Sequence, residues 1–195
     1  MNNKLFVLVG KSSVGKDAIM AILLDKINQQ NLSIKKLPSC TTRPKREVET
    51  DGVEYNFKTM RDFDESYKQG EIVEYNAYRI DNIKQTWVYY TLKSDIDLED
   101  GSMLKVVNPV GLAHLRQQYK DNIVVFYITC DDEIRKQRYL NRGALVDSLK
   151  DRFERDDLDF KYLKYDYKII NDGTHSIESH ADLILKLMKG EMGIE

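Results

Sequence analysis

The sequence is poor in cysteine and histidine, which limits the chemistry available to it. Its two cysteines, Cys40 and Cys130, lack the paired spacing of a zinc site or a redox motif. Buried or incidental thiols are therefore expected in preference to a disulfide or a metal site. The three histidines, His114, His175 and His180, show no ligand spacing, so no chemistry is assigned to them.

Long apolar runs and a strong net charge are also missing. No run approaches the roughly 18 residues of a membrane span, and the N-terminus lacks the features of a signal peptide. A net charge of −2 gives no general attraction to nucleic acid or membranes, so any cationic site must be local. These absences predict a soluble cytoplasmic protein with neither kind of partner. With 195 residues, 42% of them hydrophobic, the chain suits one compact domain with a small insertion.

A buried strand, a glycine loop and a helix follow one another at the start of the chain. Leu5–Val9 are five consecutive apolar residues, typical of a strand buried on both faces of a parallel sheet. The next residues, GKSSVGK, fit the phosphate-loop pattern GxxxxGK and lead into apolar residues at helical spacing. This order favours a phosphate site over a simple glycine turn, with Lys16 on the β- and γ-phosphates. The ATP-binding residues expected here are Gly10, Ser12, Ser13, Val14, Gly15, Lys16 and Asp17.

Asp17 departs from the phosphate-loop pattern, which has Ser or Thr at this position to bind Mg²⁺. A carboxylate is also a good Mg²⁺ ligand, directly or through water. Asp17 is therefore the candidate metal residue, with Mg²⁺ as the expected ion. The alternative is a first-turn acid favoured only by the helix dipole, and the sequence leaves both open.

A local cationic cluster follows in residues 39–58, where aliphatic residues are scarce. Arg43, Lys45 and Arg46 fall within four positions, and arginine can clamp a phosphate with two hydrogen bonds. A solvated charged loop is the alternative. With Ser39 before this cluster and Tyr55-Asn56-Phe57 after it, the stretch resembles the GMP-binding segment of the guanylate kinase family.

That resemblance implies which residues hold the nucleoside monophosphate. GEIVEY, residues 70–75, is similar to a family stretch in which the equivalent of Glu74 receives the guanine N1 and N2 hydrogens. WVYYT, residues 87–91, resembles the family's YGT segment, with Tyr89 favoured over Tyr90 for the phosphate; packing of these aromatics in a small sheet is the alternative. The GMP-binding residues implied are Ser39, Arg43, Arg46, Tyr55, Glu74, Tyr89 and Thr91.

Arginines at helical spacing later in the chain resemble the guanylate kinase lid. Arg138 and Arg142 lie four residues apart on an expected helix from about Asp132, and Arg152 falls on another helical stretch. In the family such arginines close over the transferring phosphoryl group. Asn171-Asp172 resembles the segment whose asparagine contacts adenine. The catalytic residues implied are Lys16, Arg43, Arg138, Arg142 and Arg152.

One segment departs from the family pattern. Where the family has an ILDID-like strand, with one aspartate near the guanine and another near the metal, this chain has Leu104-Lys105-Val106-Val107-Asn108. Val106 cannot accept a hydrogen bond and Asn108 carries no charge. Both the recognition of guanine and the binding of the metal therefore lack an acid that the family has. Because one carboxylate is gained where others are lost, the hypothesis is that Asp17 partly replaces the missing acid.

The expected fold is an α/β P-loop kinase with a parallel central sheet and helices on both faces. The resemblance implies a core of residues 1–38, 96–137 and 159–195, a mixed-sheet monophosphate-binding insertion of residues 39–95 and a helical lid of residues 138–158. It implies ATP-dependent phosphorylation of GMP or dGMP by a monomer or homodimer. The alternatives are a kinase of another small phosphorylated substrate and, ranked lower, a catalytically inactive binding module.

Overall fold

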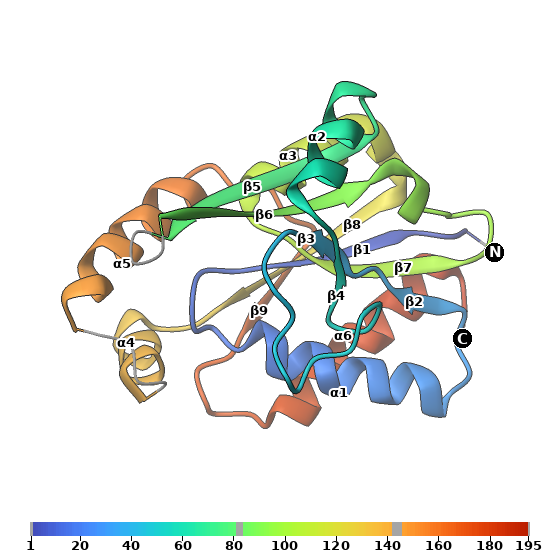
Figure 1. Cartoon of the computed structure of the whole chain (residues 1–195). Helices are drawn as coiled ribbons and strands as arrows, with labels where there is room; N and C mark the ends of the chain where they lie inside the picture. Colours follow the sequence, from blue (N-terminus) through green and yellow to red (C-terminus); the bar gives the residue numbers. More distant parts are fainter. Residues whose placement is uncertain (1, 81–83, 142–145, 195) are drawn as a thin grey trace.

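A parallel sheet with helices on both faces forms the centre of the molecule (Figure 1). The computed structural model describes residues 2–80, 84–141 and 146–194. The five parallel strands run in the order β2-β7-β1-β8-β9, and a separate four-stranded mixed sheet accompanies them. The expected α/β class is confirmed. The parallel strands are β1 (Leu5–Val9), β2 (Ile34–Lys36), β7 (Ser102–Val106), β8 (Ile123–Thr129) and β9 (Tyr167–Ile170).

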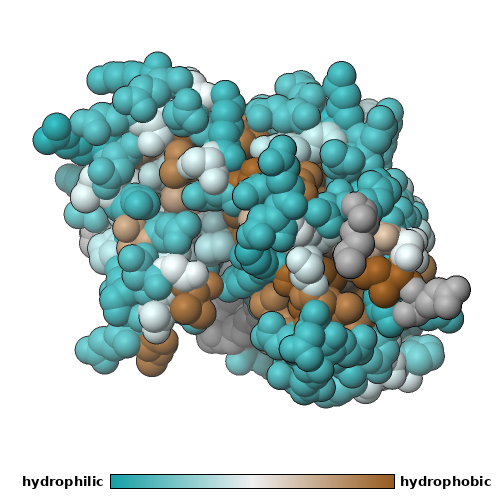
Figure 2. Space-filling model, turned by 90° about the vertical axis from the view of Figure 1, so that its right-hand side faces the viewer, coloured by the Kyte–Doolittle hydropathy of each residue, from teal (hydrophilic) through white to brown (hydrophobic). Residues whose placement is uncertain are grey.

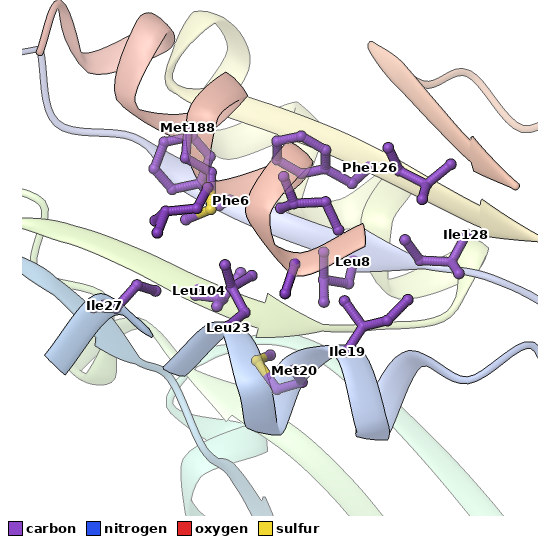
Figure 3. Packing of buried hydrophobic residues seen from close by; sticks show 14 of the residues in the cluster. Phe6, Leu8, Ile19, Met20, Leu23, Ile27, Leu104, Phe126, Ile128 and Met188 are labelled. Atoms are coloured by element: carbon purple, nitrogen blue, oxygen red, sulfur yellow. The ribbon is translucent and has the colours of Figure 1, made fainter. Parts of the chain in front are cut away.

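One face of the parallel sheet is covered by α1 (Lys16–Gln29) and α6 (Ile177–Met192). Phe6 and Leu8 point to this face from β1 and pack against Leu23 of α1 and Met188 of α6 (Figure 3). Every residue of β1 is fully buried because it is the central strand and both its faces are covered.

The opposite face is covered by α3 (Pro109–Tyr119) and by part of the second sheet. Leu5, Val7 and Val9 alternate with the residues of the other face, as a strand requires, and pack with Leu115 of α3. Val73, at the start of β5, belongs to the same cluster. The second sheet is therefore attached to the core through the apolar cluster that includes β1, the strand that leads to the phosphate loop.

The second sheet has the order β4-β3-β6-β5 and two chemically different faces. One face is apolar and packs Cys40, Val88 and Tyr90 against Phe63 of the short helix α2. Because side chains alternate along a strand, the opposite face carries the polar residues of β3, β5 and β6. These elements are β3 (Ser39–Thr41), β4 (Tyr55–Phe57), α2 (Met60–Lys68), β5 (Ile72–Ile80) and β6 (Gln85–Leu92).

Two further helices, α4 (Asp132–Asn141) and α5 (Val146–Phe160), lie beside the carboxyl end of β8 (Figure 1). The termini lie at the other end of the molecule, on a face that is mostly hydrophilic with hydrophobic residues showing between polar ones (Figure 2). Within the described ranges, the helices are too short or too polar to cross a membrane. The short 3₁₀ helices are Lys93–Asp95 and Lys120–Asn122.

Candidate active site

The phosphate loop runs from the end of β1 to the start of α1, and both of its glycines are required by geometry. Gly15 has φ 94°, a left-handed conformation that strains other residues, and a side chain there would collide with Asn171. A side chain at Gly10 would collide with the carbonyl oxygen of Ile128. The loop is therefore held close to the ends of β8 and β9.

Lys16 folds back over this loop. Its ammonium donates hydrogen bonds to the carbonyl oxygens of Gly10, over 2.7 Å, and Lys11, over 3.0 Å. Burial lowers the pKa of Lys16 to about 8, against the opposing attraction of the Asp17 and Asp156 carboxylates. The ammonium is thus only partly compensated in the free protein, which favours the arrival of an anionic phosphate.

Three side chains from α4 and α5 converge on Ser12 of the loop. The Asp156 carboxylate accepts a hydrogen bond from the Ser12 backbone N–H at 2.8 Å. Arg152 Nε donates to the Ser12 hydroxyl at 2.6 Å, and Arg135 Nε donates to its carbonyl at 3.0 Å. The two helices are therefore docked on the phosphate loop.

A buried ion pair holds the docked helices together. Arg135 Nη2 lies 2.7 Å from Asp156 Oδ2, and the two side chains are 1% and 9% exposed. The guanidinium also lies 4.1 Å from the ring centroid of Phe153 and pairs with Asp132. No local pattern indicates a role for either member of the pair, because 21 residues separate them and both meet at the phosphate loop, far away in the sequence.

Arg138 and Asn171 form a chain of hydrogen bonds that ends on the phosphate loop. Arg138 Nη1 donates to the Asn171 carbonyl at 3.2 Å, and the Asn171 side-chain amide donates to the Val14 carbonyl at 2.8 Å. Asn171 is 1% exposed, so the structure shows a supporting contact, while the adenine contact stays a prediction. Arg142 lies outside the described residues.

Asp17 is exposed in the first turn of α1, directly after the phosphate loop. Burial raises the pKa of Tyr55, and the Asp17 charge is among the groups that add to this rise. Since the same carboxylate also acts on Lys16, it lies within electrostatic reach of both candidate phosphate sites. The described residues hold no cluster of three His, Cys, Asp or Glu side chains that would bind a metal alone.

Arg43 is the centre of the second cationic site. Its guanidinium makes two hydrogen bonds to Glu49, of 2.7 and 3.0 Å, and its Nε donates to the Tyr89 hydroxyl at 3.2 Å. The hydrogen bonds from Arg43 and from the Arg46 backbone amide lower the pKa of Glu49 to about 2. The arginine is therefore preoriented by a carboxylate to which the sequence analysis gave no role.

Tyrosine rings surround this arginine. The Tyr55 ring centroid lies 5.3 Å from the Arg43 guanidinium and 5.5 Å from the Tyr89 ring. Tyr90 points the other way and is 1% exposed in the apolar cluster with Phe63. The alternation along β6 thus places Tyr89, and not Tyr90, beside Arg43. Arg46 has an exposed side chain at the edge of this cluster.

Glu74 and Thr91 face each other on the polar side of the second sheet. The Thr91 hydroxyl donates to Glu74, whose side chain is buried with 5% exposure. A Cβ at Gly111 would lie 2.9 Å from Glu74 Oε2 and 3.3 Å from Asn108 Oδ1. The glycine therefore leaves room for the carboxylate, a role that no sequence pattern had indicated.

The two positions that depart from the family pattern lie in different places. Val106 packs against the core cluster between the sheet, α1 and α6. Asn108 caps α3 by accepting from the Gly111 backbone N–H at 2.8 Å, and its amide donates to Asn76 Oδ1 at 2.8 Å. Asn108, rather than Val106, is therefore the neighbour of Glu74.

Arg152 of α5 acts on groups near both cationic sites. Burial raises the pKa of Tyr78, whose ring lies 5.7 Å from that of Tyr89, and the Arg152 charge opposes this rise. Arg152 also contacts Ser12 of the phosphate loop. One arginine thus contacts the phosphate loop and lies within electrostatic reach of the aromatic cluster around Arg43.

Comparison with known proteins places this geometry in a family. Residues 2–186 match the family model described as guanylate kinase. A guanylate kinase from Symbiobacterium thermophilum is 34% identical over 170 residues, covering 86% of this chain and 77% of that protein. One from Helicobacter pylori is 30% identical, with coverages of 97% and 89%.

A solved structure shows the same fold. The crystal structure of guanylate kinase from Anaplasma phagocytophilum has a TM-score of 0.63 and 22% identity, and the match covers 97% of this chain and 86% of that one. The family model spans nearly the whole sequence, including both cationic sites. This chain belongs to the guanylate kinase family.

Proposed function

We propose that this protein transfers the terminal phosphoryl group of ATP to GMP or dGMP, giving ADP and the nucleoside diphosphate. The observation that carries the proposal is the presence of two cationic sites, one at the phosphate loop with Lys16 and one at Arg43, and of Arg152 hydrogen-bonded to the loop. The proposed donor matches the use of ATP in the guanylate kinase family.

The proposed acceptor base is read on the polar face of the second sheet. Glu74 offers two carboxylate oxygens, and guanine has adjacent N1–H and N2–H₂ donors that match them. Adenine has no such pair of neighbouring donors, so a buried Glu74 facing it would lose hydrogen bonds. Thr91 holds the carboxylate in place, and Ser39 supplies a second polar group on the same face.

Catalysis is proposed to act through positioning and charge. The loop amides and Lys16 hold the ATP phosphates, while Arg43, Arg46, Tyr55 and Tyr89 hold the acceptor phosphate. Arg138, Arg142 and Arg152 stabilise charge on the transferring group. Alignment of two bound reactants supplies on the order of 7–11 kcal/mol, and an ionised acceptor phosphate needs no general base.

Mg²⁺ is proposed to arrive with ATP. Mg²⁺ keeps several waters and usually takes one or two carboxylates besides substrate phosphates, which fits one exposed acid beside a phosphate loop. Asp17 would hold the ion, directly or through water, and the ion would supply neutralisation of phosphate charge. We expect a cytoplasmic monomer or homodimer, since its proposed substrates are free nucleotides.

The alternatives raised by the sequence receive no specific support. An inactive binding module has no use for Lys16 and the docked arginines around an intact phosphate loop. A kinase of another small phosphorylated substrate has no use for a buried carboxylate held on the polar face.

A coupled ADP-release assay over a panel of nucleoside monophosphates and phosphorylated sugars tests the proposal, with Mg²⁺ titrated in each case. GMP or dGMP should be the best acceptor, and Lys16→Ala should reduce turnover on the order of a thousandfold or more while the protein stays folded. Lys35→Ala, which removes an exposed lysine paired with Asp100, is the matched control. Near-normal turnover of Lys16→Ala would refute the kinase proposal.

A further inference from the structure

Lys105 is a charged residue in an otherwise apolar part of the core. It belongs to β7, and its side chain is 1% exposed. Met103 and Val107, its alternate neighbours, belong to the apolar cluster beneath α3. Because a buried ammonium is costly without hydrogen bonds, its partners indicate what it does.

The partner of Lys105 lies on the polar face of the second sheet. Its ammonium donates a hydrogen bond to the Ser39 hydroxyl over 2.8 Å. Burial lowers the pKa of Lys105, and among the surrounding charges Glu74 opposes this most strongly. Lys105 therefore stands near both Ser39 and Glu74, the residues that face the base in the proposed function.

The chemistry of these groups fixes the direction of each hydrogen bond. Lys105 Nζ is the donor in its hydrogen bond with Ser39, so the Ser39 oxygen accepts from it. A serine hydroxyl keeps one O–H to donate, and no residue in the described ranges accepts it. Thr91 donates to one oxygen of Glu74, which leaves the carboxylate as an acceptor. The face thus presents one hydroxyl donor and one carboxylate acceptor.

We propose that, for the activity proposed above, Lys105 is a positioning residue for base specificity that sets the Ser39 hydroxyl to donate to the exocyclic oxygen of a 6-oxopurine. Guanine presents its O6 acceptor beside the N1–H and N2–H₂ donors, and this order matches a hydroxyl donor beside a carboxylate acceptor. Adenine presents an N6–H₂ donor in the place of O6. Ser39 then reads position 6 and Glu74 reads positions 1 and 2.

The prediction separates position 6 of the purine from position 2. IMP has the 6-oxo group and N1–H of GMP but lacks its 2-amino group, whereas AMP has a 6-amino group. Lys105→Met removes the ammonium and keeps an apolar stem of similar length. We expect kcat/KM for GMP and IMP to fall by the same factor, roughly tenfold, and that for AMP to fall much less.

Two further variants keep the test sharp. Ser39→Ala should lower the ratio of kcat/KM for GMP to that for AMP by a similar factor. The double variant Lys105→Met with Ser39→Ala should lower this ratio little further, since both residues act through one hydrogen bond. Lys35→Met, in the neighbouring strand β2, is the matched control and should leave all ratios unchanged. Thermal unfolding checks each variant, and Lys105→Gln replaces Lys105→Met if the latter does not fold.

The outcomes separate this inference from the proposed function. A wild-type protein without activity on GMP would refute the proposed function itself. An active wild-type protein whose folded Lys105 variants keep the GMP to AMP ratio would overturn only the role of Lys105. A loss that is equal for GMP and AMP would also overturn it, because a purely structural lysine would affect both alike.

Discussion

The phosphate loop and the second sheet of this protein prepare for phosphate in different ways. At the loop, the proposed binding groups are backbone amides and one lysine, and the loop is held in place by two glycines and by Asn171. At the second sheet, the proposed binding groups are side chains, and Arg43 is held by hydrogen bonds to a carboxylate, Glu49. The loop site thus depends on backbone conformation, whereas the site at the second sheet depends on an ion pair between side chains.

The two sites also differ in the protein groups that already occupy their hydrogen-bond donors before a ligand binds. In the loop, the Ser12 N–H is bonded to Asp156, so a carboxylate of α5 occupies an amide of the motif. At the second sheet, the guanidinium of Arg43 keeps one side toward Tyr89 while Glu49 takes the other. The loop therefore depends on distant helices, whereas Arg43 depends on a residue six positions away.

The largest effect is expected from breaking the buried pair between α4 and α5. Asp156→Ala would leave Arg135 buried without its partner, and we expect it to lower the free energy of unfolding by about 3–5 kcal/mol. Chemical denaturation measures this. Asp157→Ala is the control on the same helix, since Asp157 is 57% exposed in its pair with Lys11 and should cost no more than about 1 kcal/mol.

If the two aspartate variants are equally stable, the helices are not held on the loop by this pair. A second combination sharpens the result. Replacing both partners, as Arg135→Met with Asp156→Leu, should recover much of the lost stability, because no unpaired charge stays buried.

A smaller effect is expected at the second sheet. Arg43→Ala should lower kcat/KM for GMP and AMP by the same factor, roughly a hundredfold, because phosphate is common to both. Glu49→Gln should cost less, since it loosens the arginine without removing it. Arg61→Ala, an 85% exposed arginine on α2, is the control. A change in the GMP to AMP ratio for Arg43→Ala would place that arginine at the base instead.

The smallest effect is a pH dependence of the loop. The pKa of Lys16 is lowered to about 8, so the free protein loses this charge above that pH rather than near the usual value for lysine. Because phosphate binding favours the ammonium, the Kd for ATP should rise by up to about tenfold per pH unit above pH 8. Lys16→Arg stays charged and should not show this rise. Calorimetric titration measures both, and a Kd that is flat up to pH 10 would contradict the assignment.

Local patterns explain why much of the core was predictable. β1, the phosphate loop and α1 follow one another in the chain, and each is encoded by adjacent residues from Leu5 to Ile27. The strands β8 and β9 are likewise continuous apolar or alternating runs. The fold class followed from these elements and from the family resemblance.

Contacts between distant segments explain what was missed. Helix α2 has only Phe63 buried and was not predicted, although Thr59 and Asp62 form its capping box. Arg135 and Asp156 meet only because two helices dock on Ser12. Lys105 lies in β7 between the apolar residues Leu104 and Val106, so its hydrogen bond to Ser39 was visible only in three dimensions.

The comparison of the GMP to AMP ratio in the wild-type protein and in Glu74→Gln tests the central claim most directly. We expect the wild-type protein to prefer GMP by roughly tenfold to a hundredfold in kcat/KM, because adenine leaves a buried carboxylate without its donors. Glu74→Gln should erode this ratio through kcat/KM for GMP. An active, folded Glu74→Gln protein with an unchanged ratio would contradict the claim that the second sheet reads guanine.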